Sequence, residues 1–194
     1  MNLRERKAAK KREDILRSAS LVISRKGFRQ TTMEDIAAEL LMTKGSLYYY
    51  FKNKEELLFY CHEQILDDVL NQLKKISQNE ISSSEKIKAA IKVHLDTAIR
   101  EREIFNLTVK PEQIFSGEYV GAIVQKREEY TGLFDQLIQQ GIQKGEFSVT
   151  EKKMARMIIL GAANWIQVWY SPEGEFSKEE IEQVYADYLL KILT

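Results

Sequence analysis

The sequence predicts an all-α protein. Its 194 residues include only two prolines and nine glycines, so few positions interrupt a helix. Long stretches are rich in Ala, Leu, Glu, Lys and Gln, which are strong helix formers, and apolar residues recur at steps of three and four. A hydrophobic content of 44% is sufficient for a substantial buried core. We expect about nine helices.

Charge is distributed unevenly along the chain, although the formal net charge is zero. Residues 1–54 contain 13 Lys and Arg against 6 Asp and Glu, a net charge of +7. Residues 55–194 contain 16 against 23, a net charge of −7. A basic N-terminal part joined to an acidic body indicates that only the N-terminal part binds a polyanion. We therefore expect two domains, residues 1–53 and residues 54–194.

No targeting segment is evident. The first residues, MNLRERKAAKKRED, contain no apolar run, and no later segment approaches the roughly 20 apolar residues of a membrane helix. A cytoplasmic protein without membrane contact is expected. Cys61 is the only cysteine, which excludes an intramolecular disulfide and favours a small buried apolar residue.

The first helix is predicted over residues 14–26, where apolar residues recur at helical spacing, and Gly27 follows at the position of a C-terminal cap. The preceding segment from Arg4 to Arg12 carries six Lys and Arg residues but no core-facing ones. It is either a frayed arm or an extra helical turn. It could reach phosphates or remain a solvated tail.

Two short helices are predicted next. Thr32 and Asp35 have the spacing of a capping box, which starts a helix of about two turns. Thr43 is a second N-cap candidate, for a helix that runs to about Phe51. In that helix Leu47 and Phe51, four residues apart, share one face.

The run TKGSLYYYFKNK, residues 43–54, places three consecutive tyrosines among lysines. Because consecutive helical residues are about 100° apart, the tyrosines cannot all turn inward with Leu47 and Phe51, so most are exposed. Two short helices with such an exposed face form a helix-turn-helix, whose second helix enters the major groove of DNA. Lysines and hydroxyls then contact phosphates and base edges.

At this point the sequence resembles a known family. The segments ILRSASLVISRKGF and TTMEDIAAELLMTKGSLYYYFKNKEELL are similar to the DNA-binding domain of TetR/AcrR transcription regulators. The resemblance implies phosphate contacts at Thr32, Thr43, Tyr49 and Lys54, and base contacts at Lys44, Gly45, Ser46 and Tyr48. It assigns Tyr50 to either group. Packing of Tyr48 and simple solvation of Lys44 are the alternatives that the residues leave open.

The turn departs from the family pattern. Where members usually have an alanine and a glycine, this chain has Leu40 and Leu41. A left-handed leucine costs on the order of 1 kcal/mol. We therefore expect either a different turn geometry or compensation through burial of Leu41.

The remainder of the chain continues as helices. They are predicted over residues 54–77, 84–100, 102–109, 118–144, 150–171 and 177–193, with an interruption at Pro111. Ser177 and Glu180 form a capping box for the last one.

The last two helices indicate a homodimer. MARMIILGAANWIQVWY is apolar around nearly its whole circumference, so it must be covered on more than one side. A four-helix bundle around a two-fold axis suits this pattern and is also what the resemblance implies. Intrachain core is the alternative for part of the stripe. The candidate interface residues are Trp169, Ile181, Val184, Tyr185, Tyr188 and Leu189.

The resemblance also implies a regulator, most often a repressor, that binds a palindromic DNA operator. A small molecule that binds in the body would release the protein from this operator. Aromatic residues favour an apolar effector over a sugar. The C-terminal segment is similar to members that sense acyl-CoA thioesters, although bulky aromatics at helical spacing are more often core. The candidate effector residues are Phe105, Phe115, Tyr119, Arg127, Tyr130 and Trp165.

Two other classes of protein are alternatives to this interpretation. An enzyme is disfavoured because His62 and His94 are the only histidines and no Gly-rich phosphate loop or metal-spaced cluster occurs, so neither a cofactor nor a metal is expected. A carboxylate-only site is the remaining enzymatic possibility. An architectural DNA-binding protein without an effector would carry the same N-terminal part, and the sequence leaves that alternative open.

Overall fold

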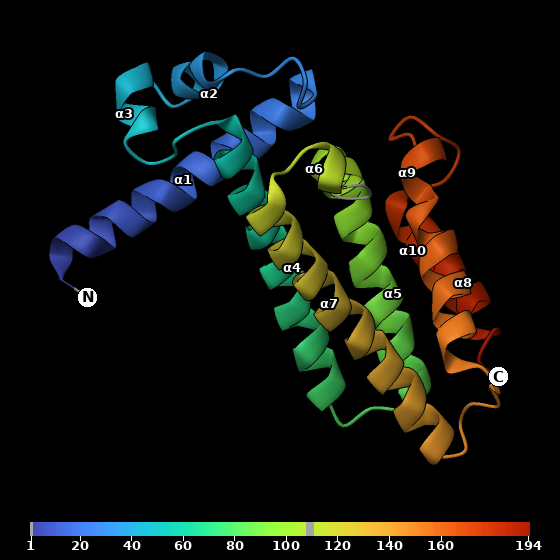
Figure 1. Ribbon diagram of the computed structural model, residues 1–194. Coiled ribbons are helices and arrows are strands. Elements are labelled where there is room, and N and C mark those ends of the chain that lie inside the picture. Colours follow the sequence, from blue (N-terminus) through green and yellow to red (C-terminus); the bar gives the residue numbers. More distant parts are fainter. Residues whose placement is uncertain (1, 108–110) are drawn as a thin grey trace. The chain divides into compact units, whose positions relative to one another are not determined.

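The computed structural model describes residues 2–107 and 111–194 (Figure 1). The described residues form helices and no strand, which confirms the all-α prediction. They pack as two compact units. Unit 1 consists of Met1–Ile65 with Glu101–Ile123, and unit 2 consists of Leu66–Arg100 with Val124–Thr194.

Unit 1 contains the N-terminal helices and a segment from the middle of the chain. Its core includes Ile15, Ile36, Leu47 and Leu57, all fully buried, and Phe115 from that later segment. The predicted end of one helix at residue 109 lies outside the described residues. The elements are α1 (Leu3–Lys26), α2 (Met33–Glu39), α3 (Lys44–Tyr48), the first part of α4 (Lys54–Gln78), α6 (Arg102–Leu107), η1 (Pro111–Gln113) and the first turns of α7 (Gly117–Gln143).

Local signals set the ends of these helices. The Thr32 hydroxyl accepts from the Asp35 amide at 3.1 Å, and the Thr32 amide donates to the Asp35 carboxylate at 2.9 Å, as the capping box predicts. Gly27 ends α1 with a φ of 78°, a value that favours glycine. The segment before Asp14 was open between an arm and a helix, and it is helical from Leu3.

The turn between α2 and α3 is left-handed at Leu41, whose φ is 51°. The Leu41 amide donates to the Ala38 carbonyl at 3.0 Å and the Met42 amide to the Ala37 carbonyl at 2.8 Å, which is the Schellman pattern. The Leu41 side chain is 96% exposed. Both expectations for this turn were therefore wrong, because the strained geometry is kept and burial does not offset it.

Unit 2 is built around α5 (Ser83–Arg100). Ile87, Ala90, Ile91 and Leu95 of this helix are fully buried, and α5 contacts α8, α9 and α10. The other elements are the rest of α4 and α7, α8 (Lys152–Asn164), α9 (Ile166–Trp169) and α10 (Lys178–Leu190). The predicted capping box of α10 is present, because the Ser177 hydroxyl accepts from the Glu180 amide at 3.2 Å.

Charged groups join α5 to α10. The Lys178 ammonium lies 2.6 Å from the Asp96 carboxylate, and Lys88 lies 2.6 Å from Asp187. These four side chains are about one-third exposed, so the pairs fix the register of the two helices more than they add stability.

A polar network centred on the buried His94 joins α5, α7 and α8. His94 Nδ1 lies 2.5 Å from the Tyr130 hydroxyl, and Nε2 lies 3.0 Å from Asn164 Oδ1. Because the Asn oxygen only accepts, Nε2 carries the proton and Nδ1 accepts from Tyr130. Burial lowers the pKa of His94 to about 4, so the ring is neutral at pH 7.

None of the helices in the described part of the chain is long and apolar enough to cross a membrane.

Replacing Leu41 by glycine is expected to stabilise the protein. The left-handed backbone conformation costs a leucine about 1–2 kcal/mol, and glycine removes this strain. Glycine also gives the unfolded chain more conformational freedom, which offsets about 0.4–1 kcal/mol of the stabilisation. We expect Leu41→Gly to raise the free energy of unfolding by up to about 1 kcal/mol in urea titrations. Leu41→Ala retains the strain and loses little packing, so it should match wild type. A destabilised glycine variant would contradict this account.

His94 should make stability dependent on pH. Its pKa is about 4 when folded and about 6.5 when unfolded, so its contribution is complete above pH 6.5 and is lost as the pH falls toward 4. The loss amounts to about 3 kcal/mol by that difference. His94→Gln lacks this titration. The stability difference between wild type and His94→Gln, from urea unfolding at fixed protein concentration, should therefore shrink between pH 7 and pH 4. A constant difference would rule out a neutral buried His94.

Candidate nucleic-acid interface

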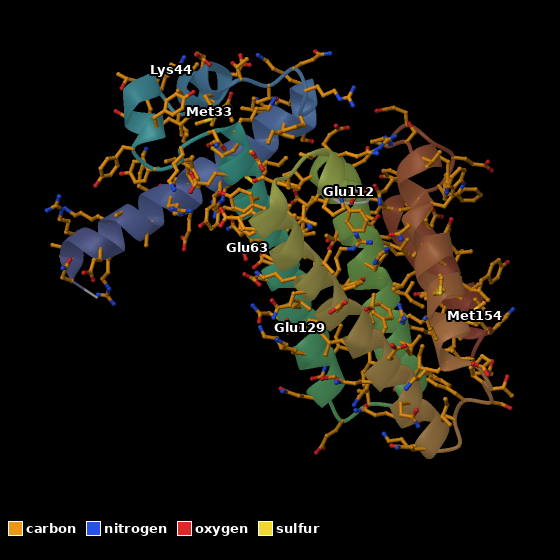
Figure 2. All side chains as sticks on the ribbon, viewed as in Figure 1. Met33, Lys44, Glu63, Glu112, Glu129 and Met154 are labelled. Atoms are coloured by element: carbon orange, nitrogen blue, oxygen red, sulfur yellow. The ribbon has the colours of Figure 1, made fainter. Side chains whose placement is uncertain are left out.

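Helix α3 has one buried and one exposed side. Leu47 is 0% exposed and Phe51, just beyond the helix, is 1% exposed, so both lie in the core of unit 1. On the other side Lys44, Gly45 and Ser46 are exposed, and Figure 2 shows Lys44 on α3. This arrangement presents the start of α3 to solvent.

The three tyrosines divide between surface and core. Tyr49 is 77% exposed and Tyr48 is 41% exposed, while Tyr50 is half-buried against the core of unit 1. The rings of Tyr49 and Tyr50 meet edge to face with centroids 5.2 Å apart. The prediction that most of these tyrosines are exposed is thus confirmed.

Hydroxyl groups cluster at the start of α3. The Thr43 hydroxyl accepts from the Ser46 amide at 3.2 Å and lies 2.9 Å from the Ser46 hydroxyl. Thr43 therefore caps α3, as the sequence predicts. Both residues are exposed, so their hydroxyls can still meet a ligand.

Lys44 forms an ion pair with Glu34 of α2. Both side chains are 55% exposed, and the hydrogen bond that the Lys44 ammonium donates to the Glu34 carboxylate raises the pKa of Lys44 and lowers that of Glu34. An anion that binds Lys44 must therefore compete with Glu34. The sequence did not reveal this pair, because nine intervening residues and a turn separate its members.

Lys54 and Thr32 lie near the ends of α4 and α2. The Lys54 ammonium lies 4.1 Å from the centre of the Phe28 ring and 3.5 Å from the Arg29 carbonyl, and burial lowers its pKa. Thr32 is exposed beside Asp35, whose pKa is lowered to about 2 chiefly by its hydrogen bond with Lys26. Contacts with neighbouring residues therefore hold both candidate phosphate-binding side chains, Lys54 and Thr32, in place.

The sequence also missed the placement of Arg12. Its guanidinium lies 4.5 Å from the centre of the Phe51 ring and 4.0 Å from that of Tyr60. Such stacking holds the arginine by cation–π attraction. It anchors α1 to Phe51, three residues past the end of α3.

The effector candidates are divided between the two units. Phe105 and Tyr119 are half-buried in unit 1, where Phe115 is buried. In unit 2, Arg127 is exposed, Trp165 is 60% exposed and Tyr130 lies in the His94 network. Of the six effector candidates, half-buried Tyr130 forms a hydrogen bond with a buried polar side chain, that of His94.

A polar pocket of about 250 Å³ opens in unit 2 between α7 and α8. Its walls carry no aromatic side chain, and Asp135 is already paired with Arg156 at 2.9 Å. The lining therefore offers no aromatic ring to an apolar effector. It is formed by Asp135, Gln136, Gln139, Gln140 and Lys152. Within residues 2–107 and 111–194, no group of three or more His, Cys, Asp or Glu could hold a metal ion.

The interface candidates separate by burial. Ile181 and Leu189 are 5% and 8% exposed, so they pack within unit 2 and leave little surface for a partner. Tyr185 is half-buried, with its ring stacked on Trp169 at 6.2 Å. Trp169, Val184 and Tyr188 are exposed at 43%, 47% and 65%.

More apolar side chains are exposed on α8 and its continuation into α9. One side of α8 is buried through Ala155, Ile159 and Ala163, whereas the other side is exposed. Figure 2 shows Met154 of that exposed side. The exposed set is Met154, Met157, Ile158, Trp165 and Val168.

Two family models match the chain. Residues 15–61 match the bacterial regulatory proteins of the tetR family, and residues 80–193 match the tetracyclin repressor-like C-terminal domain. The HTH-type transcriptional repressor KstR2 of Mycolicibacterium smegmatis is 26% identical over 198 residues, with 96% of this chain and 92% of that protein covered.

Solved structures share the fold. A TetR/AcrR-family regulator from Thermobifida fusca superposes with a TM-score of 0.80 at 31% identity, covering 93% of this chain and 97% of that one. AibR in complex with isovaleryl coenzyme A and operator DNA has a TM-score of 0.77 at 24% identity, covering 94% and 97%. The chain therefore belongs to the TetR family of bacterial regulatory proteins.

Proposed function

We propose that the chain is a DNA-binding transcription regulator in which α2 and α3 form a helix-turn-helix. The observation that carries the proposal is the two-sidedness of α3, where Leu47 is fully buried while Lys44 and Ser46 are exposed. The N-terminal residues of a recognition helix meet base edges in the major groove. The protein would then work in the cytoplasm, where bacterial DNA lies, as a regulator without a catalytic role.

The exposed side chains suit two kinds of DNA contact. We assign base contacts to Lys44, Gly45, Ser46 and Tyr48, which lie on the exposed side of α3. We assign phosphate contacts to Thr32, Thr43, Tyr49 and Lys54, which are hydroxyl or ammonium donors near helix ends. Tyr50 is half-buried, and it stays a candidate for either kind of contact.

We further propose that the protein acts as a homodimer on a palindromic operator. The exposed apolar side of α8 and α9, together with Val184 and Tyr188 of α10, would be covered by the same surface of a second copy. Two recognition helices related by the dimer axis then read two half-sites. The division into residues 1–53 for DNA and residues 54–194 for effector and dimer contacts belongs to this proposal.

Lys44 and Lys54 should differ in their effect on DNA binding. Lys44→Ala is expected to weaken binding to an operator duplex from upstream of the protein's own gene by 10-fold or more, since a base contact is worth about 1–3 kcal/mol, and to leave random duplex nearly unchanged. Lys54→Ala should weaken binding to the operator duplex and to random duplex by the same factor. It should also reduce the salt slope, which is the slope of log affinity against log salt concentration, by about 1. Fluorescence anisotropy would measure both effects.

The control for this pair is Lys75→Ala, which removes an exposed cation from unit 2. It should bind both duplexes as wild type does, with two chains for each operator duplex. Equal losses on operator and random duplex for Lys44→Ala would contradict base reading by α3.

We propose a hydrophobic effector, with an acyl-CoA thioester as the favoured class, that releases a repressor from its operator. Support comes from AibR, which shares the fold and was solved with isovaleryl coenzyme A and operator DNA. Tyr130 offers a hydroxyl beside Phe134, with ring centroids 5.4 Å apart. A thioester carbonyl accepts a hydrogen bond and its acyl chain packs on aromatic rings, so both features suit this class.

The effector is tested by release of the operator duplex. Fatty-acyl and aromatic CoA thioesters are added to the complex, each beside its free acid. We expect one thioester to release DNA and its acid to fail. Tyr130→Phe should need more thioester while binding DNA as wild type does. Specific DNA binding that is indifferent to every compound would discard the thioester and favour an effector-independent DNA-binding protein.

A further inference from the structure

The N-terminal extension of α1, residues 3–12, contributes no buried residue to the core. The first buried residue of α1 is Ile15, and residues 3–10 are all exposed. At 1.5 Å per residue those eight positions span about 12 Å. In Figure 1 the extension continues past α3, within unit 1, to the marked N-terminus.

The extension is nevertheless an ordered helix with a defined start. The Asn2 side chain accepts from the Glu5 amide at 2.9 Å, and the Asn2 amide donates to the Glu5 carboxylate at 2.8 Å. This capping box satisfies two amide donors that a frayed end would leave to water. Its base is fixed as well, because Arg12 stacks on Phe51 and Tyr60. The extension is therefore held at both ends.

Its charges oppose helix formation. Arg6 and Lys10, like Lys7 and Lys11, are like-charged pairs four residues apart, and each pair costs about 0.2–0.5 kcal/mol. No ion pair within the described residues engages any of these four cations or Arg4. The helix thus carries a concentration of unneutralised charge.

Two of these cations share a direction with Arg17. At 100° per residue, Arg6, Lys10 and Arg17 fall on the side of α1 opposite Ile15 and Ala19, which face the core. Arg17 is exposed, and Lys7 lies beside this row. A row of cations on a capped helix suits a polyanion such as duplex DNA, in which every phosphate carries one negative charge.

We propose that the extension binds the phosphate backbone of DNA that flanks the operator. This inference rests on the proposed DNA-binding function and enlarges its surface. Arg12 stacks on Phe51, three residues past the end of α3, so the base of the extension is held close to the end of α3 within unit 1. Phosphate contacts carry no base information, so the extension adds affinity without sequence preference.

The test compares two triple variants of the full chain. Arg6→Gln/Lys7→Gln/Lys10→Gln removes three cations of the extension, and glutamine keeps the helix propensity high. Lys75→Gln/Lys144→Gln/Lys153→Gln removes three exposed cations from unit 2 and gives the same net charge. The probe is a duplex that wild-type protein enriches from a pool with a randomised centre, used with its flanks and trimmed to that centre.

The extension variant should lose affinity for enriched and random duplex by the same factor. Between about 50 and 200 mM KCl its salt slope should fall by about 0.9 for each lost phosphate contact, hence by up to about 3 per protomer. Trimming the flanks should weaken wild type and the unit 2 variant but leave the extension variant unchanged. Circular dichroism should report the same helix content for all three.

Other outcomes separate the two proposals. If wild type binds the enriched duplex specifically but the two variants have the same salt slope and the same response to trimming, the extension is a solvated tail and this inference fails alone. If the variant loses only enriched duplex, the extension reads bases and the phosphate assignment is wrong. If wild type enriches no duplex, the proposed DNA-binding function fails together with it.

Discussion

Burial of Leu47 and Phe51 is the constraint on which the DNA-facing side of unit 1 depends. Leu47 lies within α3 and Phe51 three residues past its end, and the burial of both fixes the rotation of α3 about its own axis. Once that rotation is fixed, the side chains of Lys44, Ser46 and Tyr49 must point toward solvent. Helix α3 is only five residues long and could not hold this orientation by its own hydrogen bonds. The core of unit 1 therefore determines which side chains a ligand meets.

Unit 2 uses a different means to position its groups. Fully buried apolar residues of α5 supply most of the packing, and a few polar groups select the arrangement of its neighbours. His94 accepts from Tyr130 and donates to Asn164, so one neutral ring specifies the relation of three helices. A polar network of this kind stabilises the fold only when each of its polar groups has a hydrogen-bond partner. Any ligand that takes the Tyr130 hydroxyl must therefore replace what His94 loses.

Much of the fold could be predicted from the sequence because its signals are local. Thr32 with Asp35 and Ser177 with Glu180 were predicted as capping boxes, and both are present, since each depends on a spacing of three residues. Contacts between distant residues could not be predicted in this way. The stacking of Arg12 on Tyr60, the Glu34–Lys44 pair and the packing of Phe115 into unit 1 all depend on the folded chain. An apolar stripe cannot show what covers it, so Ile181 was a candidate for a dimer surface although it lies in an intrachain core.

The Glu34–Lys44 pair affects how a salt titration of this protein should be read. When Lys44 moves from Glu34 to a phosphate, the phosphate releases its condensed cation, while the abandoned carboxylate attracts a cation from solution. The net number of ions released is then smaller than the number of phosphates contacted. A count of contacts taken from the ionic-strength dependence alone would be too low. The free protein already holds, in Glu34, an internal counterion that DNA must displace.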